Sequence, residues 1–330
     1  MKKIISIALF ALLLNGCDDG DISVDSIEFQ DILPSICPDN NSTSSLIFKL
    51  KEQESLLLYL PKEVFAGEPS VGTPLVPKKY SIDLTKYRVI YRAYNGKVTL
   101  NNMCDVIPPA TPNVIEEWVA TSGIIEIITR ANKTPPDEAN GSTRIKGYTY
   151  SIIFKDITFN KPSGPQTYES FPFGDYVATI TDMPLTFVPS NAKQCTVSKQ
   201  IYNFNETAAL TIDNIDPSLI ANASTPLNQP RTGLINDTTN KVFYRVFASP
   251  LSPDYFCQTS TPSTPAITQI WAGINGITEK ESGIIEVSTT TNGNNFVHTI
   301  TLKNVSLQKG NNDFNLGNAF VLGTIITTSN

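Results

Sequence analysis

Short apolar or alternating runs recur along most of the chain and are separated by Pro, Gly, Asn and Asp. Such runs predict β-strands, and no long stretch has the 3.6-residue period of a helix. One helical turn is expected around residues 114–119. In the first half the predicted strands are 26–32, 46–50, 56–60, 80–84, 88–94, 124–129, 148–159 and 176–180. This spacing favours an all-β protein built from antiparallel β-sandwiches, Ig-like or jelly-roll-like.

An internal duplication organises these strands. Cys37 recurs as Cys195, 158 residues later, and Trp118 recurs as Trp271, 153 residues later. The other matched landmarks are Cys104 with Cys257, 122–126 with 282–286, Lys155 and Asp156 with Lys303 and Asn304, and Gly174 with Gly317. Landmarks that keep one order and nearly one offset indicate repeated modules. The chain is therefore predicted to hold two tandem β-sandwich modules, at residues 25–183 and 184–330.

The first sixteen residues have the pattern of an export signal. Lys2 and Lys3 precede a short apolar stretch that is too short to span a bilayer. The string at residues 14–17 then ends in Gly16 and Cys17 and resembles the bacterial lipobox, in which the cysteine thiol receives a diacylglycerol. We therefore expect cleavage before Cys17, lipid on Cys17, and a solvated acidic tether at residues 17–24. The alternative is an ordinary cleaved signal with a chance cysteine.

Net charge and composition limit the classes of binding partner that we expect. Removing residues 1–16 takes away two lysines and no acids, which leaves 23 basic and 31 acidic side chains and a formal charge of −8. No basic cluster occurs, which argues against nucleic-acid binding and against electrostatic docking on anionic lipid. The membrane partner is therefore expected only through the lipid on Cys17. The expected location is the cell envelope, anchored to the outer membrane and surface-exposed, with a periplasm-facing position as the alternative.

Four cysteines remain once Cys17 is assigned to lipid. They allow three pairings, and an exported protein sits where disulfides persist. Only the pairing Cys37–Cys104 and Cys195–Cys257 respects the duplication, because the other two pairings link one module to the other. One disulfide per module is predicted.

The whole mature chain resembles a set of uncharacterised two-copy lipoproteins of flavobacteria and other Bacteroidota. The likeness rests on the acidic start after Cys17, the string at residues 89–92, Cys104 with Pro108 and Pro109 after it, and the string at residues 115–118. It implies a surface or periplasmic lipoprotein. It brings no known activity, so no site residue can be transferred.

Enzymatic chemistry is hard to place on this sequence. His298 is the single histidine, and its setting predicts a strand-surface residue whose counterpart in the first module is Tyr150. No nucleophile elbow, phosphate-binding glycine loop or Cys-x-x-Cys occurs, so no metal or cofactor is predicted. A glycan-active hydrolase using Glu116 and Glu117 is the enzymatic alternative. It is disfavoured because adjacent strand residues point to opposite faces.

The candidate ligand-binding residues are two tryptophans and two tyrosine–arginine pairs. Trp118 and Trp271 could stack on sugar rings, although a tryptophan near a disulfide in a sandwich is more often a core residue. The other candidates are the pairs Tyr91 and Arg92, and Tyr244 and Arg245. The sequence thus favours a non-catalytic binding lipoprotein for a glycan or a surface protein. The alternative is a structural or adhesive subunit that assembles by pairing of edge strands.

Overall fold

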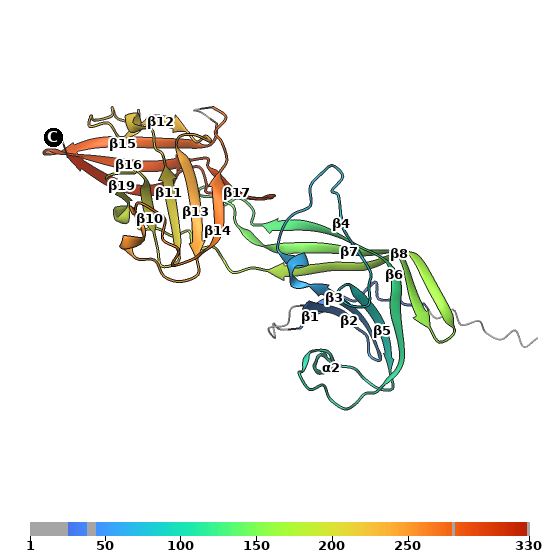
Figure 1. Cartoon of the computed structure of the whole chain (residues 1–330). Coiled ribbons are helices and arrows are strands. Elements are labelled where there is room, and N and C mark those ends of the chain that lie inside the picture. Colours follow the sequence, from blue (N-terminus) through green and yellow to red (C-terminus); the bar gives the residue numbers. More distant parts are fainter. Residues whose placement is uncertain (1–25, 38–43, 279–280, 329–330) are drawn as a thin grey trace, which may run out of the picture.

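A computed structural model describes residues 26–37, 44–278 and 281–328 of the chain (Figure 1). Cys17, the signal at residues 1–16 and the tether at residues 17–24 lie outside the described residues. The protein is all-β, and its antiparallel sheets fall into two regions that each hold one disulfide, as predicted. No helix in the described part of the chain is long and apolar enough to cross a membrane.

The first module is one antiparallel sheet of eight strands in the order β1-β2-β3-β5-β6-β7-β8, with β4 paired to β6. The strands are β1 (Ser35–Ile36), β2 (Ser44–Leu50), β3 (Glu54–Pro61), β4 (Lys78–Ser81), β5 (Arg88–Tyr94), β6 (Val114–Lys133), β7 (Ile145–Lys161) and β8 (Gly164–Thr179). The short helices η1 (Lys62–Phe65) and α2 (Leu100–Cys104) lie in its connections.

Three strands of this sheet are much longer than the sequence pattern predicts. β6 continues past Ser122 and Gly123 through shifts in its register with β7. β8 continues past Gly174, where its register with β7 shifts between Ile152 and Ile153, and β7 extends three residues before and two after the predicted 148–159. The helical turn expected at 114–119 is wrong, because these residues begin β6. The strand expected at 26–32 is also wrong, although Ile27 and Phe29 are buried in the core.

The second module is a sandwich of two antiparallel sheets. The seven-stranded sheet, in the order β18-β17-β14-β13-β11-β10-β9, is built from β9 (Lys193–Gln194), β10 (Ile201–Phe204), β11 (Ala208–Asp213), β13 (Lys241–Phe247), β14 (Ile267–Gly273), β17 (Ser306–Lys309) and β18 (Asn312–Asn315). The four-stranded sheet, β12-β15-β16-β19, is built from β12 (Arg231–Leu234), β15 (Ile284–Asn292), β16 (Asn295–Lys303) and β19 (Phe320–Thr328). The connections carry the 3-10 turns η2 (Pro189–Asn191), η3 (Pro217–Ile220) and η4 (Pro253–Tyr255).

The two modules share a backbone bend, which lies within one strand in the first module and between two strands in the second. Asp156 lies inside β7 with φ of 50°, and its counterpart Asn304 separates β16 from β17 with φ of 49°. Asp and Asn tolerate this left-handed conformation better than most residues. The match of Gly174 to Gly317 is wrong. Gly174 lies opposite Ile152 and Gly323 lies opposite Ile300, which is the residue matched to Ile152, so Gly323 is the counterpart.

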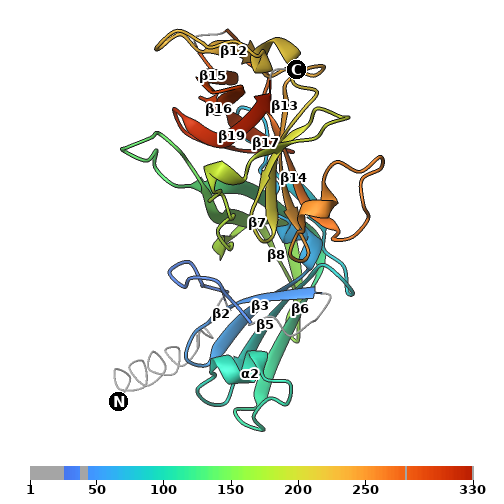
Figure 2. The same ribbon diagram turned by 90° about the vertical axis from the view of Figure 1, so that its left-hand side faces the viewer.

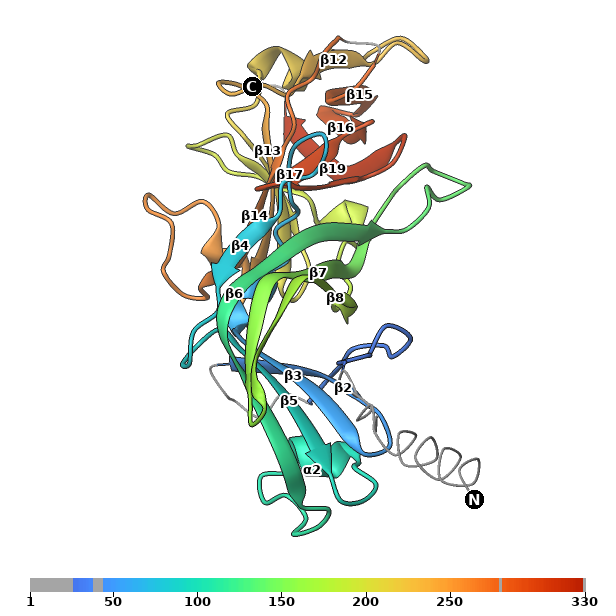
Figure 3. The same cartoon turned by 90° about the vertical axis from the view of Figure 1, so that its right-hand side faces the viewer.

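A single hydrophobic core runs through both modules, which lie end to end with α2 and β12 near opposite ends (Figures 2 and 3). At the joint, the β17–β18 hairpin reaches the first module. There Asn312 Nδ2 donates to Gly67 O at 2.7 Å, and Asn315 exchanges hydrogen bonds with Thr143. Lys133 pairs with Asp313 at 2.7 Å. The joint is therefore packed and hydrogen-bonded rather than a loose linker.

Each disulfide lies on the face of its sheet opposite to the shared core. Cys37–Cys104 packs with a small cluster around Phe48, and Cys195–Cys257 packs with a separate cluster of aromatic residues. Strand alternation produces this division, since neighbouring residues of β13 such as Tyr244 and Arg245 point to opposite faces. The second module therefore has a substantial outer face in addition to its core.

Candidate functional site

Both tryptophans lie in the core. Trp118 is 2 % exposed and Trp271 is 3 % exposed. The indole N–H of Trp118 donates to Glu116 at 2.7 Å, and that of Trp271 donates to Gln269 at 3.1 Å. Such burial leaves too little ring surface for a sugar to stack on, so the stacking interpretation is corrected in favour of the core alternative. The disulfides are not their neighbours, because they occupy the opposite face of each sheet.

The tyrosine–arginine pairs divide between the two faces. Tyr91 and Tyr244 are buried in the core, whereas Arg92 and Arg245 lie half-exposed on the outer faces. Arg92 Nε donates to Glu117 Oε2 at 2.7 Å. Glu117 is therefore held in an ion pair on the outer face, while Glu116 is held by Trp118 in the core layer. The two carboxylates do not form the dyad that a glycoside hydrolase needs.

The histidine is buried, which corrects the prediction of a strand-surface residue. His298 is fully buried between Thr289 and Thr327, whose hydroxyls lie 2.9 Å from Nδ1 and 2.8 Å from Nε2. Burial, together with the positive charge of Arg231, lowers the pKa of the His298 imidazole. Both ring nitrogens have a partner within the chain, so we assign His298 a structural role.

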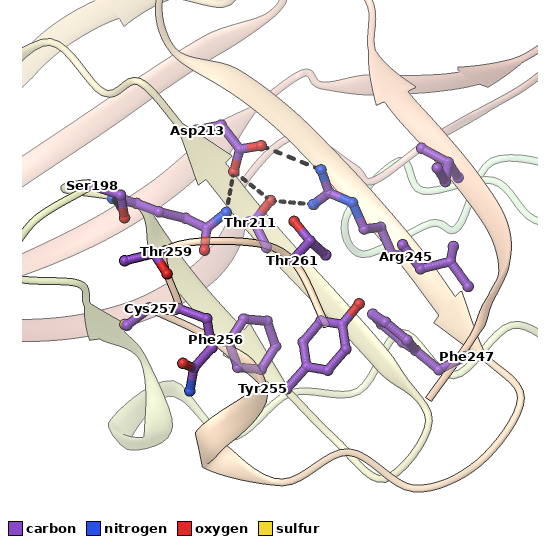
Figure 4. A pocket seen from close by; sticks show the side chains of 14 residues that line it. Ser198, Thr211, Asp213, Arg245, Phe247, Tyr255, Phe256, Cys257, Thr259 and Thr261 are labelled. Carbon is purple, nitrogen blue, oxygen red and sulfur yellow. Dashed lines mark hydrogen bonds and ion pairs between the residues drawn. The ribbon is translucent and has the colours of Figure 1, made fainter. Parts of the chain in front are cut away.

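A groove of about 440 Å³ lies on the outer face of the seven-stranded sheet, beside the second disulfide (Figure 4). Its floor comes from β11 and β13, and one wall is the connection from β13 to β14 that contains η4 and Cys257. Nine of its fourteen lining residues have polar side chains: Ser198, Gln200, Thr211, Asp213, Arg245, Tyr255, Gln258, Thr259 and Thr261. A groove of this volume is within the usual range of small-ligand sites.

One charge network spans the groove floor. Arg245 Nη2 lies 3.2 Å from Asp213 Oδ2, and Arg245 Nη1 donates to Thr211 Oγ1 at 2.7 Å. Asp213 Oδ1 also accepts from Gln200 Nε2 at 2.7 Å and from Thr211 Oγ1 at 2.9 Å. The guanidinium lies 4.5 Å from the centre of the Phe243 ring. These contacts hold the two ionised groups in place, so the polar floor is preorganised.

An aromatic cluster supports the other side of the groove. Tyr202 stacks on Phe256 with ring centres 4.1 Å apart, and Tyr255 makes edge contacts with Phe247 and Phe256. Figure 4 shows the Tyr255 ring between these two phenylalanines, with its hydroxyl directed toward Thr261 and Arg245. Tyr255 is 8 % exposed, and no described residue offers its buried hydroxyl a hydrogen-bond partner. A buried hydroxyl without a partner is costly. Asn203 and Asn312 also have such an atom, but of the three residues only Tyr255 lines the groove.

The polar floor of this groove is not repeated in the first module. Register places Thr211 where the first module has Leu57, and Asp213 where it has Tyr59. Arg92 instead pairs with Glu117, which corresponds to Ile270. Of the residues that the sequence singled out as ligand-binding, the groove contains only Arg245. Polar departures from the repeat would have indicated the rest, but they become visible only once the strand register aligns the two modules.

Within the described part of the chain, no group of three or more His, Cys, Asp or Glu side chains is placed to hold a metal ion. The groove, by contrast, joins a fixed ion pair, several hydroxyls and an unpartnered tyrosine. Comparison of the chain with protein-family models, with curated proteins and with solved structures gives no significant match, so its geometry is the basis for assigning a function.

Proposed function

We propose that this protein is a non-catalytic binding lipoprotein of the cell envelope. A lipid on Cys17 would tether it to the outer membrane, facing the cell exterior or the periplasm, and the groove of the second module would capture a glycan or protein ligand. The observation that carries the binding proposal is the buried Tyr255 hydroxyl, which lacks a partner within the described chain while facing a preorganised polar floor. A bound ligand group that completes this hydrogen bond would remove the desolvation cost.

The groove can be erased by copying the first module. Replacing Thr211, Asp213 and Ile270 with Leu, Tyr and Glu transfers the outer-face residues of the first module, including a carboxylate for Arg245. The lipid-free chain from residue 18, which contains every described element, is screened against a glycan array and against surface and secreted proteins. The grafted variant should lose the ligands of the parent protein while retaining its thermal stability. If the graft binds everything that the parent binds, the groove is not the site.

The tether is tested separately. Cys17→Ala should abolish metabolic labelling by palmitate and move the protein from the membrane fraction to the soluble fraction. Protease treatment of intact cells then distinguishes the two faces of the outer membrane: loss of the protein supports surface exposure, and full protection supports a periplasm-facing position.

One observation favours a second candidate function, a structural or adhesive subunit. Strand β8 spans 16 residues and forms an edge of the eight-stranded sheet, where its outer backbone groups could pair with another chain. Analytical ultracentrifugation should then show concentration-dependent oligomers of the lipid-free chain. A monomer at every concentration would contradict this function and leave the binding proposal unaffected.

A further inference from the structure

We infer that the groove of the second module takes an uncharged sugar, and that the Asp213–Arg245 pair excludes acidic glycans. This inference rests on the proposed function and goes beyond it by naming the ligand class. It follows from three properties of the groove: its charge balance, the hydroxyls among its polar groups, and its shape.

The groove contains one positive and one negative charge. Asp213 and Arg245 are the only charged residues among its described lining, and they neutralise each other at 3.2 Å. Thr211 and Gln200 further occupy the carboxylate. A uronate or phosphate group would have to displace Asp213 from Arg245, or lie against an unscreened carboxylate. Either arrangement is unfavourable, whereas a neutral hydroxyl can donate to Asp213 or accept from Arg245 without breaking the pair.

Most of the uncharged polar side chains in the groove carry hydroxyls. Ser198, Thr259 and Thr261 contribute hydroxyls around the groove, and Tyr255 adds a hydroxyl that no described residue satisfies. A hydroxyl can both donate and accept, so it pairs best with a ligand that offers several groups of the same kind. Sugars carry a hydroxyl on most ring carbons. An apolar metabolite would leave these groups unpaired, which is costly in a recessed site.

The shape of the groove favours a ring over a protein surface. The floor is recessed beneath the connection from β13 to β14, which contains η4. The Cys195–Cys257 disulfide ties that connection to the end of β9, which pairs with β10. Ile267 and Ile270 form an apolar wall, and Ile270 is half-exposed. The C–H groups of a sugar ring can pack on such a wall while its hydroxyls reach the polar floor.

The test uses matched probes. Neutral oligosaccharides and the same oligosaccharides oxidised at C6 to uronates differ in one carboxylate per residue, and titration calorimetry measures both on the lipid-free chain. The parent protein should bind a neutral member of the panel at least tenfold more tightly than its uronate. Tyr255→Phe, which removes one hydroxyl, should weaken that binding about tenfold, since one hydrogen bond is lost.

The sharpest variant is Asp213→Asn, which leaves Arg245 without its carboxylate. It should shift selectivity toward the uronate, because the groove then carries a net positive charge. The matched control is Glu117→Gln in the first module, which makes the same chemical change beside Arg92 and should alter neither affinity.

The outcomes separate this inference from the proposed function. A parent protein that prefers uronates, or an Asp213→Asn variant with unchanged selectivity, overturns the neutral-sugar assignment even where Tyr255→Phe weakens binding and the groove stands. Failure of the whole panel to bind also overturns it, and the grafted variant then decides whether the groove binds protein. Neutral sugars that bind the grafted variant as tightly as the parent overturn both proposals.

Discussion

Two buried tyrosines provide a controlled comparison at the scale of single residues. The Tyr150 hydroxyl donates to Phe65 O at 2.9 Å and accepts from Gly67 N at 3.1 Å, whereas the Tyr255 hydroxyl has no described partner. Burial raises the pKa of Tyr150 to about 12, so its hydroxyl remains a donor across the ordinary pH range. The same chemical change at these two positions should therefore have opposite effects on stability.

We predict that Tyr255→Phe raises the free energy of unfolding of the ligand-free protein by about 1 kcal/mol, because it removes a buried group without a partner. Tyr150→Phe should lower it by about 1 to 3 kcal/mol, because two backbone groups lose their partner. Denaturant titration measures both. Destabilisation by Tyr255→Phe would show that the hydroxyl is satisfied in the free protein and would remove the observation on which the groove assignment rests.

The hydrogen bonds around His298 determine its tautomer. Arg231 donates to Thr289 Oγ1 at 2.9 Å, so the Thr289 proton is directed to Nδ1 of His298. Thr327 donates to Asn222 Oδ1, so it accepts from Nε2–H of the imidazole. Protonation of Nδ1 would place a second donor against Thr289 and a second positive charge near Arg231. The neutral ring is therefore built into this network.

This network predicts a pH dependence of stability. Burial and then Arg231 lower the pKa of folded His298 below the usual 6.5, so the unfolded chain binds more protons as the pH falls below 6.5. The stability that the neutral ring contributes is complete above pH 6.5 and is lost as the pH falls from there toward the folded pKa. The thermal unfolding temperature should therefore fall more between pH 7 and pH 5 in the parent protein than in the His298→Gln variant. Parallel pH profiles of the two proteins would contradict the prediction.

At the scale of the element, the second disulfide should shape the groove as well as stabilise the chain. It closes a loop with a sequence separation of 62 residues, and the first disulfide closes one of 67. In the chain-entropy model, replacing either cysteine pair with serine costs about 4 kcal/mol. Only the Cys195→Ser and Cys257→Ser variant should become sensitive to chymotrypsin at Tyr255 and Phe256. Equal cleavage in the Cys37→Ser and Cys104→Ser variant would show that the connection opens independently of its disulfide.

The sequence predicted which segments are strands better than where strands end. Residues 88–94 match β5, because this mostly apolar run is bounded by turn formers on both sides. The predicted strand at 148–159 is shorter than β7, which runs through Asp156 in a left-handed conformation. The prediction already carried the strand through Asp156, and it missed only three residues at the start and two at the end, where pairing with β6 and β8 extends the strand. The two tryptophans illustrate a similar limit, because alternation gives a face but does not say which face is buried.

The candidate site was largely hidden for the same reason. Arg245 drew attention because it repeats Arg92, yet the residues that give the groove its chemistry are those that do not repeat. Thr211 and Asp213 are seen to correspond to Leu57 and Tyr59 only when β11 and β3 are aligned by their strand register. Tyr255 lies in a connection whose path depends on a disulfide and on packing against Phe256. Local sequence patterns do not contain such long-range placement.

At the scale of the whole molecule, the modules should unfold as one unit, since their core is continuous. Phe314 of the second module packs against Trp271. The Arg144 guanidinium of the first module lies 5.9 Å from the centre of the Phe314 ring. Phe48, by contrast, is buried in the separate cluster beside the first disulfide, within the first module alone.

Calorimetry of the lipid-free chain should therefore show one unfolding transition. Phe314→Ala should lower the free energy of unfolding by about 3 to 5 kcal/mol, because a cavity opens at the joint. Phe48→Ala should lower the temperature of that same transition, although its cavity opens only in the first module. Two transitions in the parent protein, each shifted by only one of these substitutions, would show that the modules unfold independently. One shared transition would instead mean that ligand bound in the groove also stabilises the first module, because binding to the folded state shifts the unfolding equilibrium of the whole cooperative unit.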